Sequence, residues 1–168
     1  MGKVVEDHVD RLRSQWAREL PDLDTTPMAV LGRIYRLSQL ATPGIEETFA
    51  GFELDRGEFD VLATLRRSGP PYRLTPTELY TALMIASGSL THRLGRLESA
   101  GLIARRPSDE DGRSLAVELT KEGKRRAEQA FRADMSNEMR FLEGVDEGDL
   151  NKLAVLLRRL TLAIEQKA

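Results

Sequence analysis

Cysteine is absent from the 168 residues of this chain. The absence excludes disulfide bonds, zinc–thiolate centres and a cysteine-based redox sensor. Histidine is nearly absent as well, because His8 and His92 are the only two, which is too few for a typical structural zinc site. The sequence also lacks a recognisable cofactor motif. We therefore expect neither a bound metal nor a cofactor.

Long apolar segments are missing too. No run approaches the roughly 18–20 residues that a transmembrane helix needs. The first segment, MGKVVEDHVDRLRSQW, mixes charges in a way that a secretory signal does not. With 40% hydrophobic and 31% charged residues, the composition is that of an ordinary globular domain. We expect a single cytoplasmic domain without a membrane segment.

Motifs for catalysis are also lacking, since there is no glycine-rich phosphate loop, no nucleophile motif and no HExxH sequence. An enzyme is therefore not expected. The net charge of −2 argues against a surface that is basic all over. The charge is uneven, because residues 1–65 carry 7 basic and 12 acidic side chains whereas residues 66–113 carry 8 and 5. This local positive excess is too modest to identify a nucleic-acid-binding protein by itself.

Helical patterns cover most of the chain, and prolines and glycines separate them. The first helix is predicted over about residues 4–20, where Pro21 ends it. A second long pattern begins at Pro27, and Pro43 with the following glycine is expected to break or kink it. A third helix is predicted over about residues 55–67, and a Ser-Gly-Pro-Pro sequence closes it.

Two short helices joined by a tight turn come next. Thr75-Pro76-Thr77-Glu78 is a capping box with proline at the first helical position, and it begins a helix that extends to about Leu83. After a turn over residues 84–86, another helix is predicted from about Ser87 to Ala100, before Gly101. This arrangement is a helix-turn-helix.

The only strand pair of the sequence is predicted directly behind these helices. Residues 102–106 and 114–119 flank the polar loop over residues 107–113, and a hairpin in this place is a wing. A further helix is predicted from Thr120 to about Glu143. The expected fold is therefore mainly α with a small β-hairpin wing, a winged helix-turn-helix.

The helix over residues 87–100 has two different faces. Leu90, Leu94, Leu97 and Ala100 fall on the core side, whereas the opposite face holds small, hydroxyl-bearing and hydrogen-bond-donating residues without an acid. Such a face can enter a major groove, and an arginine at the wing tip, oriented by adjacent acids, suits a narrow minor groove. The alternative is an ordinary solvated face beside a charged surface turn. The residues predicted to contact DNA are Ser87, Gly88, Ser89, His92, Arg96, Arg106, Asp111 and Arg113.

Arg93 departs from this pattern, because its helical angle places it on the inward arc. A buried, unpaired guanidinium is unfavourable, so Arg93 needs an anion nearby. That anion is either a carboxylate of the fold, with Asp60 as one candidate, or a ligand. Trp16 also allows two interpretations, since it either packs in the core or forms one wall of a pocket for a flat ligand.

The last helix is predicted to begin at Asp146. Its apolar residues step by three and four positions, which predicts a seam for a partner helix and therefore dimerisation. The seam consists of Leu150, Leu153, Leu157, Leu160 and Ile164.

The stretch over residues 101–123, GLIARRPSDEDGRSLAVELTKEG, resembles the wing signature of MarR-family regulators. The matching residues are Gly101-Leu102-Ile103, Arg105, Asp111-Gly112-Arg113 and Leu119-Thr120 followed by Gly123. The order of the predicted elements fits as well, so the resemblance covers nearly the whole chain. It implies a homodimer in which residues 1–54 and 120–168 form the dimerisation region. Residues 55–119 would bind a palindromic site on double-stranded DNA.

Within that family the chain is most similar to the urate-responsive branch, which carries an additional N-terminal helix. The ligand site of that branch is associated with a tryptophan from this helix, an aspartate from the helix before the helix-turn-helix, an arginine inside the recognition helix and an arginine at the start of the wing. Trp16, Asp60, Arg93 and Arg105 occupy the matching places. The resemblance implies a repressor that urate or a related purine releases from its operator.

Two other functions stay open. A MarR-type repressor could respond to a different small aromatic acid or to a phenolic compound, with the match of four residues coincidental. A helical dimeric interaction module without DNA binding is the alternative from another class, and the acidic overall charge favours it.

Overall fold

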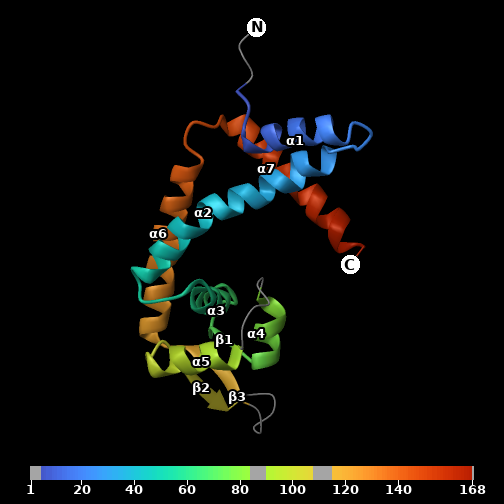
Figure 1. The fold of residues 1–168 in the computed structure, drawn as a ribbon. Helices are drawn as coiled ribbons and strands as arrows, with labels where there is room; N and C mark the ends of the chain where they lie inside the picture. Colours follow the sequence, from blue (N-terminus) through green and yellow to red (C-terminus); the bar gives the residue numbers. More distant parts are fainter. Residues whose placement is uncertain (1–4, 84–89, 108–114, 168) are drawn as a thin grey trace.

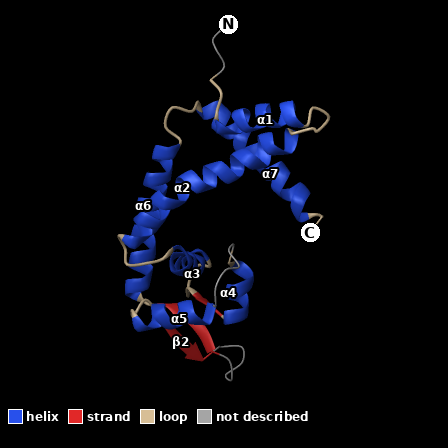
Figure 2. Ribbon diagram, viewed as in Figure 1, coloured by secondary structure: helices blue, strands red, loops and turns tan. Residues whose placement is uncertain are grey.

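The computed structural model describes residues 5–83, 90–107 and 115–167. It has a compact lower part, with short helices and a small sheet, and an extended upper part made of helices (Figure 1). Helices dominate the chain, and the strands are confined to the lower part (Figure 2). This arrangement confirms the prediction of a mainly helical fold with a small wing.

The first helix, α1 (His8–Glu19), begins where a capping box fixes its start, later than residue 4. The Asp7 carboxylate accepts a hydrogen bond from the backbone N–H of Asp10 at 2.8 Å, and the Asp10 side chain accepts one from the N–H of Asp7. Both carboxylates also form ion pairs with Arg33, at 2.7 Å and 2.6 Å. These contacts hold α1 against the next helical segment.

That segment starts with a π-helical turn, η1 (Met28–Gly32), which continues directly as α2 (Arg33–Ala50). Of the break or kink expected at Pro43, a break is wrong, because α2 passes through this residue. Proline removes one helical hydrogen bond, but α2 packs against a later helix that supports it here. Asn137 of that helix donates a hydrogen bond from Nδ2 to the Gly44 carbonyl at 3.0 Å.

Two helices of the lower part begin and end close to the predicted positions, and a third ends close to its predicted position. They are α3 (Arg56–Arg67), α4 (Pro76–Ala82) and α5 (Leu90–Ser99). The capping box of α4 is confirmed, since Glu78 donates its N–H to Thr75 Oγ1 at 3.2 Å and accepts the Thr75 N–H at 2.7 Å. The predicted turn over residues 84–86 and the predicted helix start at Ser87 lie outside the described residues.

The sheet has three strands rather than the predicted two. Strands β2 (Ile103–Pro107) and β3 (Leu115–Leu119) form the antiparallel pair of the wing. A two-residue strand, β1 (Arg73–Leu74), pairs with the other edge of β3, so the order is β1-β3-β2. An ion pair of 2.9 Å between Arg73 and Glu118 crosses this edge. Two residues are too few to show an alternating pattern, and the sequence therefore does not reveal β1.

The hydrophobic core lies in the lower part, where α3 packs against α5, the sheet and the long helix α6 (Lys121–Phe141). Leu62 and Leu65 of α3 are completely buried there. At the start of α6, Gly123 lies so close to the sheet that a Cβ at this position would be 1.9 Å from the Leu102 carbonyl oxygen. The core thus fixes α5, the wing and α6 relative to one another.

The last helix, α7 (Glu147–Glu165), crosses the upper part (Figure 1) and contains no buried residue. It begins at Asp146, as predicted, because the carboxylate of this residue caps the first turn. Among the helices of the described residues, none combines the length and the apolar character needed to cross a membrane.

Candidate functional site

The outward face of α5 carries His92 and Arg96, two of the residues predicted to contact DNA. His92 and Ser99 are exposed and Gly95 is partly buried, so this face is open to solvent. Ala100 was expected on the core side and is exposed instead, because α5 ends one residue earlier. Other predicted contacts lie outside the described residues: Ser87, Gly88, Ser89, Asp111 and Arg113.

Arg96, another predicted DNA contact, is held by acidic residues at the start of α3. Its Nε lies 2.8 Å from Glu58 Oε1, and its Nη1 lies 3.5 Å from Asp55 Oδ2. Glu58 is buried and closes the capping box of α3 together with Asp55. The Arg96 side chain is 54% exposed, so it ties α5 to α3 while part of it faces solvent.

The two arginines of β2 have different surroundings. Arg105, predicted for the ligand site, forms an ion pair with Glu98 of α5, with 3.0 Å between Nε and Oε2. Arg106 is exposed, and within the described part of the chain it has no ion-pair partner. Arg106 is therefore available for phosphate contacts, whereas Arg105 is already paired.

Arg93 points inward from α5 onto α3, as predicted. Its guanidinium lies directly over Gly57, where a Cβ would be 2.2 Å from the guanidinium Cζ and 2.4 Å from Nη2. Glycine at this position of α3 is what leaves space for the arginine. Among the residues that the structure describes, no carboxylate lies within ion-pair distance of Arg93.

Asp60 follows Gly57 on α3 by three residues, and it interacts electrostatically with Arg93. Burial raises the pKa of the Asp60 carboxyl, while Arg56 and Arg93 act in the opposite direction. Its Oδ2 is buried and accepts no hydrogen bond from the described residues. Such an oxygen is unfavourable without a donor, and a ligand with an N–H group would supply one.

Trp16 does not join these residues within one chain. It lies on α1, which is at the opposite end of the molecule from α3 and α5 (Figure 1). The residue is 45% exposed, so it does not pack in the core of the single chain either. Of the residues predicted for the ligand site, one chain therefore brings together only Arg93 and Asp60.

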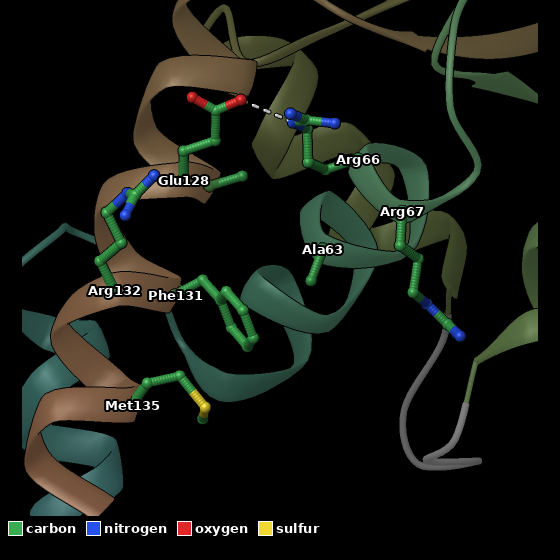
Figure 3. A pocket seen from close by; sticks show the side chains of 8 residues that line it. Ala63, Arg66, Arg67, Glu128, Phe131, Arg132 and Met135 are labelled. Atoms are coloured by element: carbon green, nitrogen blue, oxygen red, sulfur yellow. Dashed lines mark hydrogen bonds and ion pairs between the residues drawn. The ribbon is translucent and has the colours of Figure 1, made fainter.

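A groove with a volume of about 900 Å³ runs between α3 and α6 (Figure 3). Phe131 points from α6 toward α3, and Met135 lines the next turn of α6. The Phe131 ring stacks on Phe59 with 6.5 Å between centroids, and an ion pair of 2.6 Å between Arg66 and Glu128 lies at the groove. The sequence does not reveal this groove, because apolar residues spaced like Phe131 and Met135 occur on any amphipathic helix.

A buried carboxyl of α6, that of Asp134, was also missed by sequence reasoning. It is 5% exposed, and its Oδ1 has no hydrogen-bond donor among the described residues. Burial and then Glu138 raise the pKa of this carboxyl, while Arg56 acts against them. The sequence contained a signal for it: Asp134 is a charged residue at helical spacing from Ala127 and Ala130, on the same stripe of small residues that the structure buries.

The predicted seam of α7 is open to solvent in the single chain. Leu153, Leu157 and Ile164 are 45%, 38% and 51% exposed, and Leu150 and Leu160 are partly buried. An apolar stripe of this kind is typical of a surface that another protein covers.

Comparison with known proteins agrees with this architecture. The MarR family model matches residues 52–114. The chain is 40% identical to the HTH-type transcriptional regulator PecS of Dickeya dadantii (strain 3937) over 160 residues, which cover 95% of each protein. This relative is named as a transcriptional regulator, not as an enzyme.

Solved structures of regulators share the fold. A mutant of MarR from E. coli, complexed with operator DNA, is 25% identical with a TM-score of 0.67 and covers 86% of this chain and 96% of its own. BpsR of Bordetella bronchiseptica, whose DNA binding is regulated by 6-hydroxynicotinic acid, is 21% identical with a TM-score of 0.68 and covers 79% and 92%. The 40% identity to PecS over nearly the full length of both proteins, the family match over residues 52–114 and the winged fold agree: this chain belongs to the MarR family of transcriptional regulators.

Proposed function

We propose that this chain is a homodimeric DNA-binding repressor that urate or a related purine releases from a palindromic operator. One observation carries the ligand part of the proposal. Arg93 belongs to the helix whose outer face is predicted to contact DNA, yet it points inward over Gly57 beside Asp60. A ligand bound there would act directly on the DNA-contacting helix.

The DNA-binding part rests on the region over residues 55–119. Its α5 presents the exposed His92 and Ser99, and its wing presents Arg106. MarR of E. coli has the same fold and forms a complex with operator DNA. In our proposal residues 1–54 and 120–168 form the dimerisation region, with the apolar seam of α7 facing a second copy.

In this mechanism the Arg93 guanidinium donates hydrogen bonds to the anionic edge of a planar purine, and Asp60 Oδ2 accepts a ring N–H. Arg105 joins the ligand only if it leaves Glu98, and Trp16 reaches it only from the second chain of the dimer. A ligand that pulls on Arg93 moves α5. The ligand can change the affinity for DNA only to the extent that it binds the two conformations of the dimer with different affinities.

The first test is fluorescence polarisation of a labelled duplex from the region upstream of this protein's own gene. We expect saturable binding that weakens steeply with salt, because phosphate contacts release counterions, and that urate reverses. Binding that urate does not affect would remove the ligand from the proposal. The absence of DNA binding across a wider search of sites would favour the dimeric interaction module instead.

The second test concerns the Arg93 site itself. Arg93→Ala removes the guanidinium, and Gly57→Ala keeps it but fills the space in which it lies. We expect either change to weaken urate binding roughly tenfold or more, since charged hydrogen bonds are lost. Alanine is also a better helix former than glycine, so Gly57→Ala should fold.

Isothermal titration calorimetry without DNA measures this effect. Gly95→Ala is the matched control, because a Cβ at Gly95 would meet nothing within 4 Å. If folded Arg93→Ala and Gly57→Ala proteins bind urate as tightly as the Gly95→Ala protein, the proposed mechanism is wrong.

A different aromatic acid is the second candidate ligand, and the groove between α3 and α6 favours it. Phe131 and Met135 offer apolar surface there, while Arg66 and Arg132 offer positive charge. BpsR, which shares the fold, responds to 6-hydroxynicotinic acid. Release of DNA by 6-hydroxynicotinate but not by urate would select this candidate.

A further inference from the structure

Asp134 lies on the face of α6 that packs into the molecule, one turn beyond Ala130. The other buried positions of this helix are glycine or alanine, so their stripe allows α3 and α2 to approach closely. The aspartate in this stripe is only 5% exposed to solvent. Its carboxyl group contributes neither apolar contact area nor a helix cap.

The hydrogen bonding of this carboxyl is incomplete. Its Oδ1 is buried and receives no hydrogen bond from the residues that the structure describes. A buried acceptor without a donor destabilises a fold. Because alanine fits the neighbouring positions, packing alone does not require an acid here.

Asp134 faces the same region as Asp60, from the opposite helix. Arg56, the first residue of α3, interacts electrostatically with both carboxyl groups, and Asp60 interacts with Asp134. Asp60 Oδ2 is the other buried oxygen without a donor in the described part of the chain. Two unsatisfied acceptors therefore occur where α3 packs against α6, and the Asp60 carboxyl also interacts electrostatically with Arg93.

We propose that Asp134 is a second carboxylate of the ligand site, which with Asp60 accepts hydrogen bonds from two N–H groups of a planar heterocycle whose anionic edge binds Arg93. The inference rests on the proposed function and extends it to a residue of α6. It also names the ligand class, an anion that carries ring N–H donors in addition to its acceptors. Urate belongs to this class, whereas an aromatic acid without N–H groups does not.

Calorimetry with urate and with its singly N-methylated derivatives tests the proposal. Asp134→Asn removes the charge with little change in shape, and Asp134→Ala is the second variant, which suits the small-residue stripe if the first does not fold. Asp22→Asn, an exposed change of the same chemistry in the loop after α1, is the control. Thermal unfolding of each protein without ligand is measured alongside.

We expect Asp134→Asn or Asp134→Ala to bind urate roughly tenfold or more weakly than wild type. The methyl group that blocks the N–H facing Asp134 should weaken binding to wild type and to Asp22→Asn, but much less to the Asp134 variants. The melting temperature of free Asp134→Ala should equal or exceed that of wild type, since an unsatisfied buried acceptor is removed. Asparagine keeps a carbonyl acceptor and adds N–H donors, so Asp134→Asn removes only the charge.

Unchanged urate affinity in the Asp134 variants would overturn this inference and leave the proposed function intact. A second outcome would also overturn the inference: urate affinity and melting temperature fall together in the variants, and every methylated urate loses binding by the same factor in variant and wild type. Asp134 would then act through the fold alone. If wild type binds no urate, the proposed ligand fails, and this inference fails with it.

Discussion

Four carboxyl groups of this chain illustrate two kinds of surroundings with opposite effects on the pKa. Asp7 and Glu78 accept backbone N–H groups at helix starts, which lowers the pKa of each. Asp60 is partly buried and Asp134 is buried, and this burial raises the pKa of each carboxyl. A raised pKa means that the folded chain holds the proton more tightly than the unfolded chain does. The stability contributed by Asp60 and Asp134 therefore falls as the pH rises through the raised pKa.

Replacing Asp60 with asparagine should accordingly stabilise the free protein at neutral pH, by about 1 kcal/mol in the free energy of unfolding. The advantage over wild type should shrink as the pH falls through the raised pKa, and vanish below the ordinary value of 3.8. Urea unfolding at a series of pH values measures this difference. The exposed change Asp22→Asn should show no such trend, and an Asp60→Asn protein that is less stable at neutral pH would contradict the assignment.

Single helices show how local sequence fixes boundaries. Asp7, Asp55 and Thr75 each begin a helix and each receives a reciprocal hydrogen bond from the residue three positions later. These caps are local, and the sequence of the Thr75 box was sufficient to place the start of α4.

Thr75→Ala should therefore lower the free energy of unfolding by about 1 kcal/mol, because the first turn of α4 loses its side-chain acceptor. Chemical denaturation followed by circular dichroism measures the change. Thr77→Ala is the matched control, since Thr77 is exposed within the same turn and its hydroxyl caps nothing in the described structure. Equal effects of the two substitutions would show that the capping bond is not what stabilises this helix.

Features that depend on distant contacts were not predictable in the same way. Pro43 is a helix breaker by its own chemistry, and only the packing of α2 against α6 explains why the helix continues. The strand β1 exists because β3 has a free edge beside it. The inward direction of Arg93 was predictable from helical periodicity, whereas the partner of Arg105 and the position of Trp16 depend on how elements pack.

At the scale of the whole molecule, the upper part exposes apolar side chains to solvent. The seam of α7 and apolar residues of α2 such as Ile34 and Leu37 are exposed, although both helices are ordered elements of the fold. A single hydrophobic core in the lower part does not account for them. A second copy of the chain would cover this surface.

If the seam of α7 joins two copies as proposed, Leu157→Glu should give a monomer of 18.8 kDa, because it places a charge in the centre of the seam. Light scattering coupled to gel filtration measures the mass. Asn151→Glu introduces the same side chain on the other side of α7 and should leave the mass unchanged. A Leu157→Glu protein that keeps twice the monomer mass would place the dimer contact elsewhere.

The base of the wing is joined to α6 more tightly than a flexible connection would be. Gly123 touches the Leu102 carbonyl, and Thr120 Oγ1 donates to the carbonyls of Gly101 and Leu102 at 2.8 Å and 3.2 Å. These contacts connect the end of α5, the start of the wing and the start of α6. With 21 residues, α6 is a lever arm of about 30 Å. In the proposed homodimer, a small rotation at the wing would therefore become a displacement of several ångströms where α6 enters the upper part. The splay angle between the two copies, rather than a sliding of α5 alone, would then set the distance between their proposed DNA-contacting surfaces.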